Sequence, residues 1–227
     1  ELPLNGSKRL LSATSNQAAG LGKYCRDFLF NPQSVSAATF ELVERFHLDS
    51  VGCAISAIHH RANACTVLRR EALQTLPAAQ HSGGICFGDQ TLVETARSVA
   101  ANVAAVREWD ANGTNFGFDK DAGRTAGEFG HNDFYPVAMA ASREAGFDGN
   151  GALRLMLLID EIRGRLAEVF PLRMYAIDHV HHGAVASAAA FTAALGGTVS
   201  QIESAIGLVV SHYVPFRAIR AGSQLSD

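Results

Sequence analysis

Three polar segments carry ionisable side chains at places where the packing of a core does not require them. These segments are residues 110–114, 130–133 and 177–180. A histidine that precedes a helix can act together with the free backbone N–H groups of the first helical turn, which favour a carboxylate or a developing enolate. The three segments are therefore candidates for a site that handles an acidic substrate.

The residue types in these segments suit β-elimination of water from a hydroxy acid. This reaction needs a base that removes a proton next to a carboxylate, an acid that protonates the departing hydroxyl, and donors that hold the aci-carboxylate. Asp110, His131 and His179 could fill the acid and base roles. Each also has a plain structural explanation, as a residue bonded to its local loop, a helix cap and a buried histidine, respectively.

The third segment and the two histidines that follow it suggest a metal site as an alternative. Asp178, His179, His181 and His182 carry groups that bind zinc or iron. On a helix, however, His179 and His182 would share one face and His181 would point elsewhere. The spacing of these residues therefore favours a site without a metal ion.

The sequence pattern predicts that the elements positioning these residues are helices. Apolar residues recur with a period close to 3.6 from Phe40 to Ile58, and further helices are expected over about 62–76, 91–109, 136–145, 152–170 and 183–195. Pro136 suits a first helical turn, and Thr198-x-x-Gln201 predicts a capping box that opens the last helix. We therefore expect an all-α fold of seven or eight helices in residues 36–227, on which an N-terminal extension, 1–35, packs. Regular structure should stop in the polar segment 110–133, because it is rich in glycine.

Composition excludes several classes of protein. The net charge is −3, without blocks of like charge, which argues against a nucleic-acid partner. The apolar runs are far shorter than the roughly 20 residues that cross a bilayer, so no membrane span is expected. The four cysteines form no C-x-x-C pair and are expected to be reduced, which suits the cytoplasm or, in a eukaryote, the mitochondrial matrix. Nucleotide-binding glycine motifs and G-x-S-x-G are absent from the sequence.

An ordered set of motifs resembles the MmgE/PrpD family, which includes 2-methylcitrate dehydratase. The resemblance runs from about Phe40 to the end of the chain and rests on Leu48-Asp49-Ser50-Val51-Gly52-Cys53, Cys86-Phe87-Gly88, Trp109-Asp110-Ala111-Asn112-Gly113-Thr114, Gly130-His131, Asp178-His179-Val180, the alanine-rich stretch 183–196 and residues 217–227.

This resemblance implies a large helical domain, an α+β lid domain that is absent from this chain and follows it, a homodimer, and catalysis without a cofactor. It implies catalytic roles for Asp110, His131 and His179, and it places Asn112 and Thr114 among the substrate-binding residues. Arg217 and Arg220 could add positive charge for a small anionic carboxylic acid. The expected reaction is dehydration of a small tricarboxylate such as 2-methylcitrate.

The sequence also departs from the family motifs. Gly113 replaces an aspartate, and Asn132 and Asp133 replace a proline and a serine. These changes alter the charge expected in the pocket, so they leave open decarboxylation of a cis-aconitate-type acid or epimerisation of a diacid, which share a carbanion-like intermediate. A helical interaction domain without catalytic activity is the alternative from another class.

Overall fold

The computed structural model of the protein describes residues 15–31, 35–77, 82–113, 116–119, 124–128, 131–170 and 172–216. It confirms the expected helical fold class, with eight α-helices and two short hairpins in that part of the chain. The helices are α1 (Gln17–Phe30), α2 (Ala37–His59), α3 (Asn63–Ala72), α4 (Thr95–Arg107), α5 (Tyr135–Ala145), α6 (Gly149–Val169), α7 (Val180–Ala194) and α8 (Val199–His212). Among the described residues, no helix has the length and apolar character needed to cross a membrane.

Short polar side chains determine where several of these helices begin. The side chains of Ser36 and Asp148 accept hydrogen bonds from backbone N–H groups in the first turns of α2 and α6. The predicted capping box is confirmed, because Thr198 and Gln201 each bond the backbone of the other at the start of α8. Pro136 stands in the first turn of α5, as predicted.

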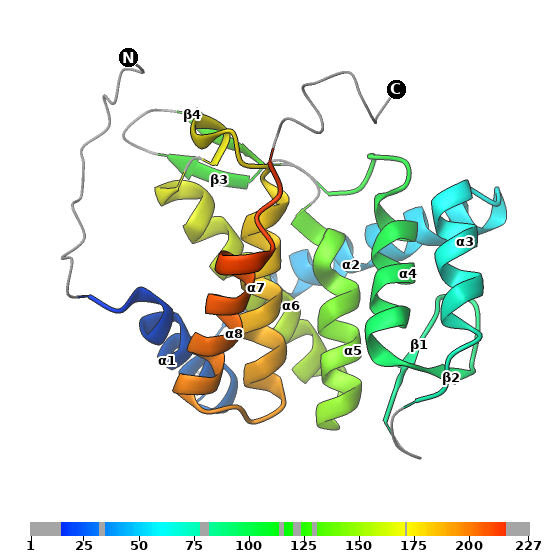
Figure 1. Cartoon of the computed structure of the whole chain (residues 1–227), viewed down its shortest axis with the longest axis horizontal. Helices are drawn as coiled ribbons and strands as arrows, with labels where there is room; N and C mark the ends of the chain where they lie inside the picture. Colours follow the sequence, from blue (N-terminus) through cyan, green and yellow to red (C-terminus); the bar gives the residue numbers. More distant parts are fainter. Residues whose placement is uncertain are drawn as a thin grey trace.

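Helices that follow one another along the chain lie side by side in space. Figure 1 shows α3, α4, α5, α6, α7 and α8 neighbouring each other in this order, and α1 packs against α8. Short connections join α5 to α6 and α7 to α8, whereas the connections before and after α4 contain the hairpins. The remaining long helix, α2, packs against α4 and α6, so it contacts both the middle and the α3 side of the bundle.

The core lies where α5, α6 and α7 meet. Large apolar side chains of α6, among them Leu155, Leu158 and Ile159, are fully buried against the alanine-rich face of α7. Small residues on α7 let a neighbouring element approach its backbone closely. Gly183 shows this most clearly, because a Cβ atom at that position would collide with the ring of Phe134.

The polar segment after α4 contains regular structure that the sequence did not predict. Strands β3 (Phe116–Asp119) and β4 (Arg124–Glu128) pair in an antiparallel hairpin whose register shifts between Phe116 and Phe118, and β3 contacts α6. A second hairpin joins β1 (Gly84–Ile85) to β2 (Leu92–Val93). Glycines and charges interrupt the alternation in β3 and β4, and β1 and β2 have two residues each, so neither hairpin has a clear period of 2.

Polar groups lie inside the helix bundle beside this apolar core. Arg163 of α6 is fully buried, and its guanidinium lies 4.8 Å from the centre of the Phe134 ring. On the same helix, Asp160 Oδ2 accepts a hydrogen bond of 2.6 Å from the hydroxyl of Tyr135. Burial raises the pKa of Asp160 to about 7, whereas burial and then the Arg163 charge lower the pKa of His182 to about 4.

The close approach of Phe134 to α7 predicts opposite effects for two glycine-to-alanine substitutions. Gly183→Ala should lower the free energy of unfolding by about 1–3 kcal/mol, because the methyl group overpacks the Phe134 ring. Gly207→Ala on α8, where a Cβ meets no atom within 4 Å, should raise it by up to about 1 kcal/mol through helix propensity. Urea unfolding of both variants measures this difference, and a stabilised Gly183→Ala would contradict the packing described.

The two shifted pKa values predict opposing pH dependences of stability. The native Asp160 keeps its proton up to about pH 7, against an ordinary pKa of 3.8, so its contribution to stability is lost as pH rises through that window. The native His182 resists protonation down to about pH 4, against an ordinary pKa of 6.5, so its contribution is lost as pH falls.

Between pH 4.5 and 6.5, the urea midpoint of Asp160→Asn should therefore rise with pH more steeply than that of the unmodified protein. The midpoint of His182→Gln should rise less steeply or fall. Identical pH slopes for the two variants and the parent would show that neither group titrates abnormally.

Candidate active site

Asp110 lies just beyond the end of α4. Its backbone adopts a left-handed conformation, with φ of 49°, and its N–H group donates to the carbonyl of Arg107 at 3.0 Å. The Asp110 carboxylate forms an ion pair with the Arg107 guanidinium, and the Asp110 side chain is 70% exposed. Its exposure lets a small molecule from solvent reach this carboxylate.

Asn112 lies two residues further on, and it is buried in a network of side-chain amides. Its Nδ2 donates to Asn132 Oδ1 at 2.8 Å and also to the carboxylate of Asp133. Asn132 and Asp133 belong to the 3-10 helix η1 (His131–Phe134), which leads into α5. The structure therefore joins the first predicted segment to the second, and it uses the Asn112 amide nitrogen to do so.

The same network attaches both segments to α2. Asn132 Nδ2 donates to the carbonyl of Phe46 at 2.7 Å and to Asp49 Oδ2 at 3.0 Å. The carboxylate of Asp49 also accepts from the backbone N–H of Gly113 at 2.7 Å. Asn132 replaces the proline of the family motif, so the departure supplies an amide that bonds to both neighbouring segments.

Arg107 lies between two carboxylates. Besides the ion pair with Asp110, its Nε is 3.6 Å from Asp133 Oδ2. Burial raises the pKa of Asp133 above its usual range, although the hydrogen bond from Asn112 and the charges of Arg107 and Arg163 act in the opposite direction. The Arg107 side chain is 23% exposed, whereas the Asp133 side chain is 5% exposed.

The third predicted segment lies at the start of α7. Asp178 Oδ1 accepts from the N–H of Val180 at 3.1 Å and lies 3.4 Å from His179 Nδ1. The N–H of Asp178 donates to the carbonyl of Pro215 at 2.8 Å, which fixes the segment after α8 against it. The side chains of Asp178 and His179 are both buried. A carboxylate at Nδ1 sets the orientation of an imidazole ring, as is common for histidines that transfer protons.

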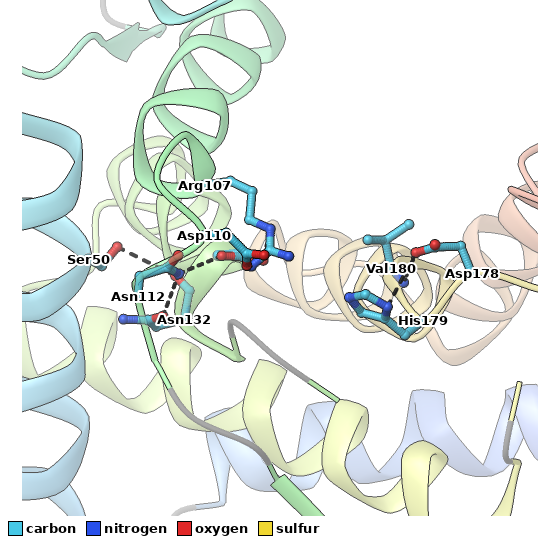
Figure 2. A network of polar contacts seen from close by, with 9 residues as sticks. Ser50, Arg107, Asp110, Asn112, Asn132, Asp178, His179 and Val180 are labelled. Carbon is cyan, nitrogen blue, oxygen red and sulfur yellow. Dashed lines mark hydrogen bonds and ion pairs between the residues drawn. The ribbon is translucent and has the colours of Figure 1, made fainter. Parts of the chain in front are cut away.

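Figure 2 shows these groups together. In that view, Arg107 and Asp110 lie between the asparagine pair Asn112 and Asn132 and the Asp178–His179 pair. The groups come from the end of α4, from η1 and from the start of α7, which are far apart in the sequence. The ring of Phe134 lies against Gly183, so η1, which carries partners of Asn112, contacts the first turn of α7.

Sequence reasoning missed both arginines of this region, Arg107 and Arg163. Burial raises the pKa of Asp133, and the Arg163 charge opposes this rise after the Asn112 hydrogen bond and the Arg107 charge. Burial lowers the pKa of His182, and the Arg163 charge lowers it further. Arg163 therefore connects η1 electrostatically to α7. A signal was present, since Arg163 lies four residues after Ile159 on the buried face of a helix whose other buried residues are mostly apolar.

The remaining predicted residues are described only in part. His131 begins η1, next to Asn132, but its side chain lies outside the described part of the structure. Thr114, Arg217 and Arg220 also lie outside the described residues.

The described residues do not form the metal site considered as an alternative. His181 and His182 are both buried in the first turn of α7, but they interact with different segments, His181 with the backbone of Tyr213 and His182 with the backbone of Phe170. Among the described residues, no three His, Cys, Asp or Glu side chains gather as a metal-binding group. The four cysteines are free thiols, as expected.

Two comparisons with known proteins bear on the whole chain. A search among curated proteins found no significant match. The family model of the MmgE/PrpD N-terminal domain matches residues 21–226, which is nearly the entire sequence. Members of this family are generally lyases of the dehydratase kind. The length of this match, together with the ordered motifs, shows that the chain belongs to the MmgE/PrpD family and carries its N-terminal domain.

Proposed function

We propose that the protein is a cofactor-independent hydro-lyase that dehydrates a small tricarboxylate such as 2-methylcitrate. The observation that carries the proposal is a partly exposed arginine, Arg107, held between the carboxylates of Asp110 and Asp133 in the region that also contains the Asp178–His179 pair. The family match supports the reaction class.

The reaction removes a proton from a carbon beside a carboxylate and expels a hydroxyl group from the adjacent carbon. Deprotonation places negative charge on the carboxylate oxygens, so a fixed cation nearby lowers the barrier. The departing hydroxide takes a proton from a general acid and leaves as water. In this proposal, either Asp110 or His131 removes the proton, and the other assists the departure of the hydroxyl.

His179 assists the departure of the hydroxyl and the binding of a carboxylate. Its position beside Asp178 supports this role, since the nearby carboxylate can orient the ring. Thr114, Asn112, Arg217 and Arg220 complete the proposed substrate-binding set.

Arg107 adds a substrate-binding group that the sequence did not suggest. A planar guanidinium binds a carboxylate through two parallel hydrogen bonds. Because the Asp110 side chain is largely exposed, a substrate carboxylate can take its place beside Arg107 and leave Asp110 available as a base.

Two other reactions are alternatives to dehydration. Decarboxylation of a cis-aconitate-type acid and epimerisation of a diacid pass through the same carbanion, and Gly113 lacks the carboxylate found at that motif position. We further propose a homodimer, a location in the cytoplasm or the mitochondrial matrix, and a lid domain that completes the active site.

The test is turnover by the complete polypeptide with 2-methylcitrate, citrate and cis-aconitate as substrates. Absorbance of the conjugated double bond reports dehydration, and released carbon dioxide reports decarboxylation. Dehydration of 2-methylcitrate is the expected result. Release of carbon dioxide without dehydration would identify the reaction as decarboxylation. No turnover of any of these acids would favour the interaction domain.

Substitution of the proposed acid and base residues should abolish most activity without unfolding the protein. Asp110→Asn and His179→Gln should each lower kcat by about 100-fold or more, the effect expected for a positioned proton-transfer group. Asp27→Asn and His212→Gln replace exposed residues outside the site and serve as matched controls. Unchanged kcat in both site variants, with normal thermal unfolding, would exclude these roles.

Substitution of Arg107 should act mainly on substrate binding. Arg107→Gln should raise KM about tenfold or more, because a charge-assisted hydrogen bond to the substrate carboxylate is lost. Arg107→Lys should show a smaller rise, since it keeps the charge without the planar fork. Steady-state kinetics on variants with verified folding separate KM from kcat. A large loss of kcat at constant KM would contradict a binding role.

A further inference from the structure

A second site lies on the opposite side of α4 from α5, along α3. It is a hollow of about 590 Å³ lined by Ile58, Arg61, Cys65, Thr66, Arg69, Arg70, Leu73 and Gln74. This volume is in the range of small-molecule sites. Figure 1 shows α3 at the edge of the bundle, away from α7. None of the lining residues belongs to the candidate active site.

Three arginines line this hollow, and they have few counter-charges. Arg69 is held in place by a hydrogen bond of 3.1 Å from its Nε to the carbonyl of Phe87 and by an ion pair of 3.4 Å with Asp89. Backbone and side-chain hydrogen bonds from Thr91 lower the pKa of Asp89, so its carboxylate stays ionised. Within the described part of the chain, Arg61 and Arg70 form no ion pair. Three positive charges thus lie near two carboxylates, Asp89 and Glu108, the second of which acts on Cys65 in the lining.

The backbone at Arg61 adopts a conformation that glycine usually occupies. Arg61 adopts a left-handed conformation, with φ of 53°, immediately after the C-cap of α2. The N–H of Ala62 then donates to the carbonyl of Ala57 at 3.1 Å, which is the bond that closes a helix end of this type. Glycine is the usual residue at this position, because any side chain there is strained.

All three arginines lie at the C-terminal ends of helices. Arg69 and Arg70 lie in the last turn of α3, where positive side chains interact favourably with the free carbonyl groups. Arg61 directly follows the C-cap of α2, so the negative end of that helix acts on it in the same way. The three residues also share the hollow that they line.

We propose that this hollow binds a small polyanion with at least two negative charges, held through phosphate or carboxylate oxygens. Guanidinium groups bind both kinds of oxyanion through two hydrogen bonds. The hydroxyl of Thr66 and the amide of Gln74 supply further hydrogen bonds, and Ile58 and Leu73 provide apolar walls. This site is independent of the proposed dehydratase reaction.

Isothermal titration calorimetry of the complete polypeptide tests the proposal, with inorganic pyrophosphate and citrate as separate probes at low ionic strength. Arg61→Gly and Arg70→Gln should each weaken binding about tenfold or more, since each removes one charge-assisted contact. Arg45→Gln, an exposed arginine of α2 outside the hollow, is the matched control and should leave binding unchanged. Arg61→Gly should melt no lower than the unmodified protein, because glycine suits the left-handed conformation.

Binding of either probe that depends on Arg61 and Arg70 supports the site, and the probe that binds more tightly identifies the oxyanion. Citrate binding that is unaffected by these two variants belongs to another site. Absence of binding for both probes, or binding that neither variant weakens, would overturn the proposal.

Discussion

The burial of one guanidinium group constrains the centre of this structure. A charged group removed from water costs several kcal/mol unless other charges and hydrogen bonds surround it. Arg163 is fully buried, and it is surrounded by the ring of Phe134 and by the electrostatic influence of Asp133, Asp160 and His182. These residues come from η1, α6 and α7, so the charge of Arg163 favours the packing in which those three elements meet.

The candidate active site extends from this buried charge toward the surface. The charges of Arg163 and Arg107 both act on the Asp133 carboxylate, and Arg107 in turn pairs with the exposed Asp110. Exposure therefore increases along a row of alternating charges. The buried end is held by packing and amide hydrogen bonds, whereas the outer end can exchange an ionic partner. Proposed acid–base chemistry at the outer end would use this rigid support.

The sequence predicted α2 to α8, because their apolar periodicity and caps are local signals, whereas α1 lies in the part expected only as an N-terminal extension. The capping box at Thr198 and the first turn at Pro136 are examples. The hairpin of β3 and β4 was not predicted, since its strands carry glycines and charges and are stabilised by pairing with each other and by contact with α6. Strand pairing depends on partners distant in sequence, so short segments reveal little of it.

Local patterns did not reveal the contacts that build the candidate site. Motif spacing selected Asp110, Asn112 and His179, whose roles in a site stay predictions. It gave no role to Asn132 and Asp133, which differ from the family motif, and it did not separate Arg163 from the apolar residues around it. Those roles depend on contacts between α2, η1 and α6, which no local pattern encodes.

Titration of His182 by NMR most directly tests the claim that a buried charge organises this region. In the unmodified protein, the imidazole should titrate near the pKa of about 4 that burial and Arg163 impose. In Arg163→Met, the pKa should rise partway toward the ordinary value of 6.5, because burial remains while the charge is removed. A His182 that titrates near 6.5 in the unmodified protein, or whose pKa is unchanged in Arg163→Met, would contradict the account.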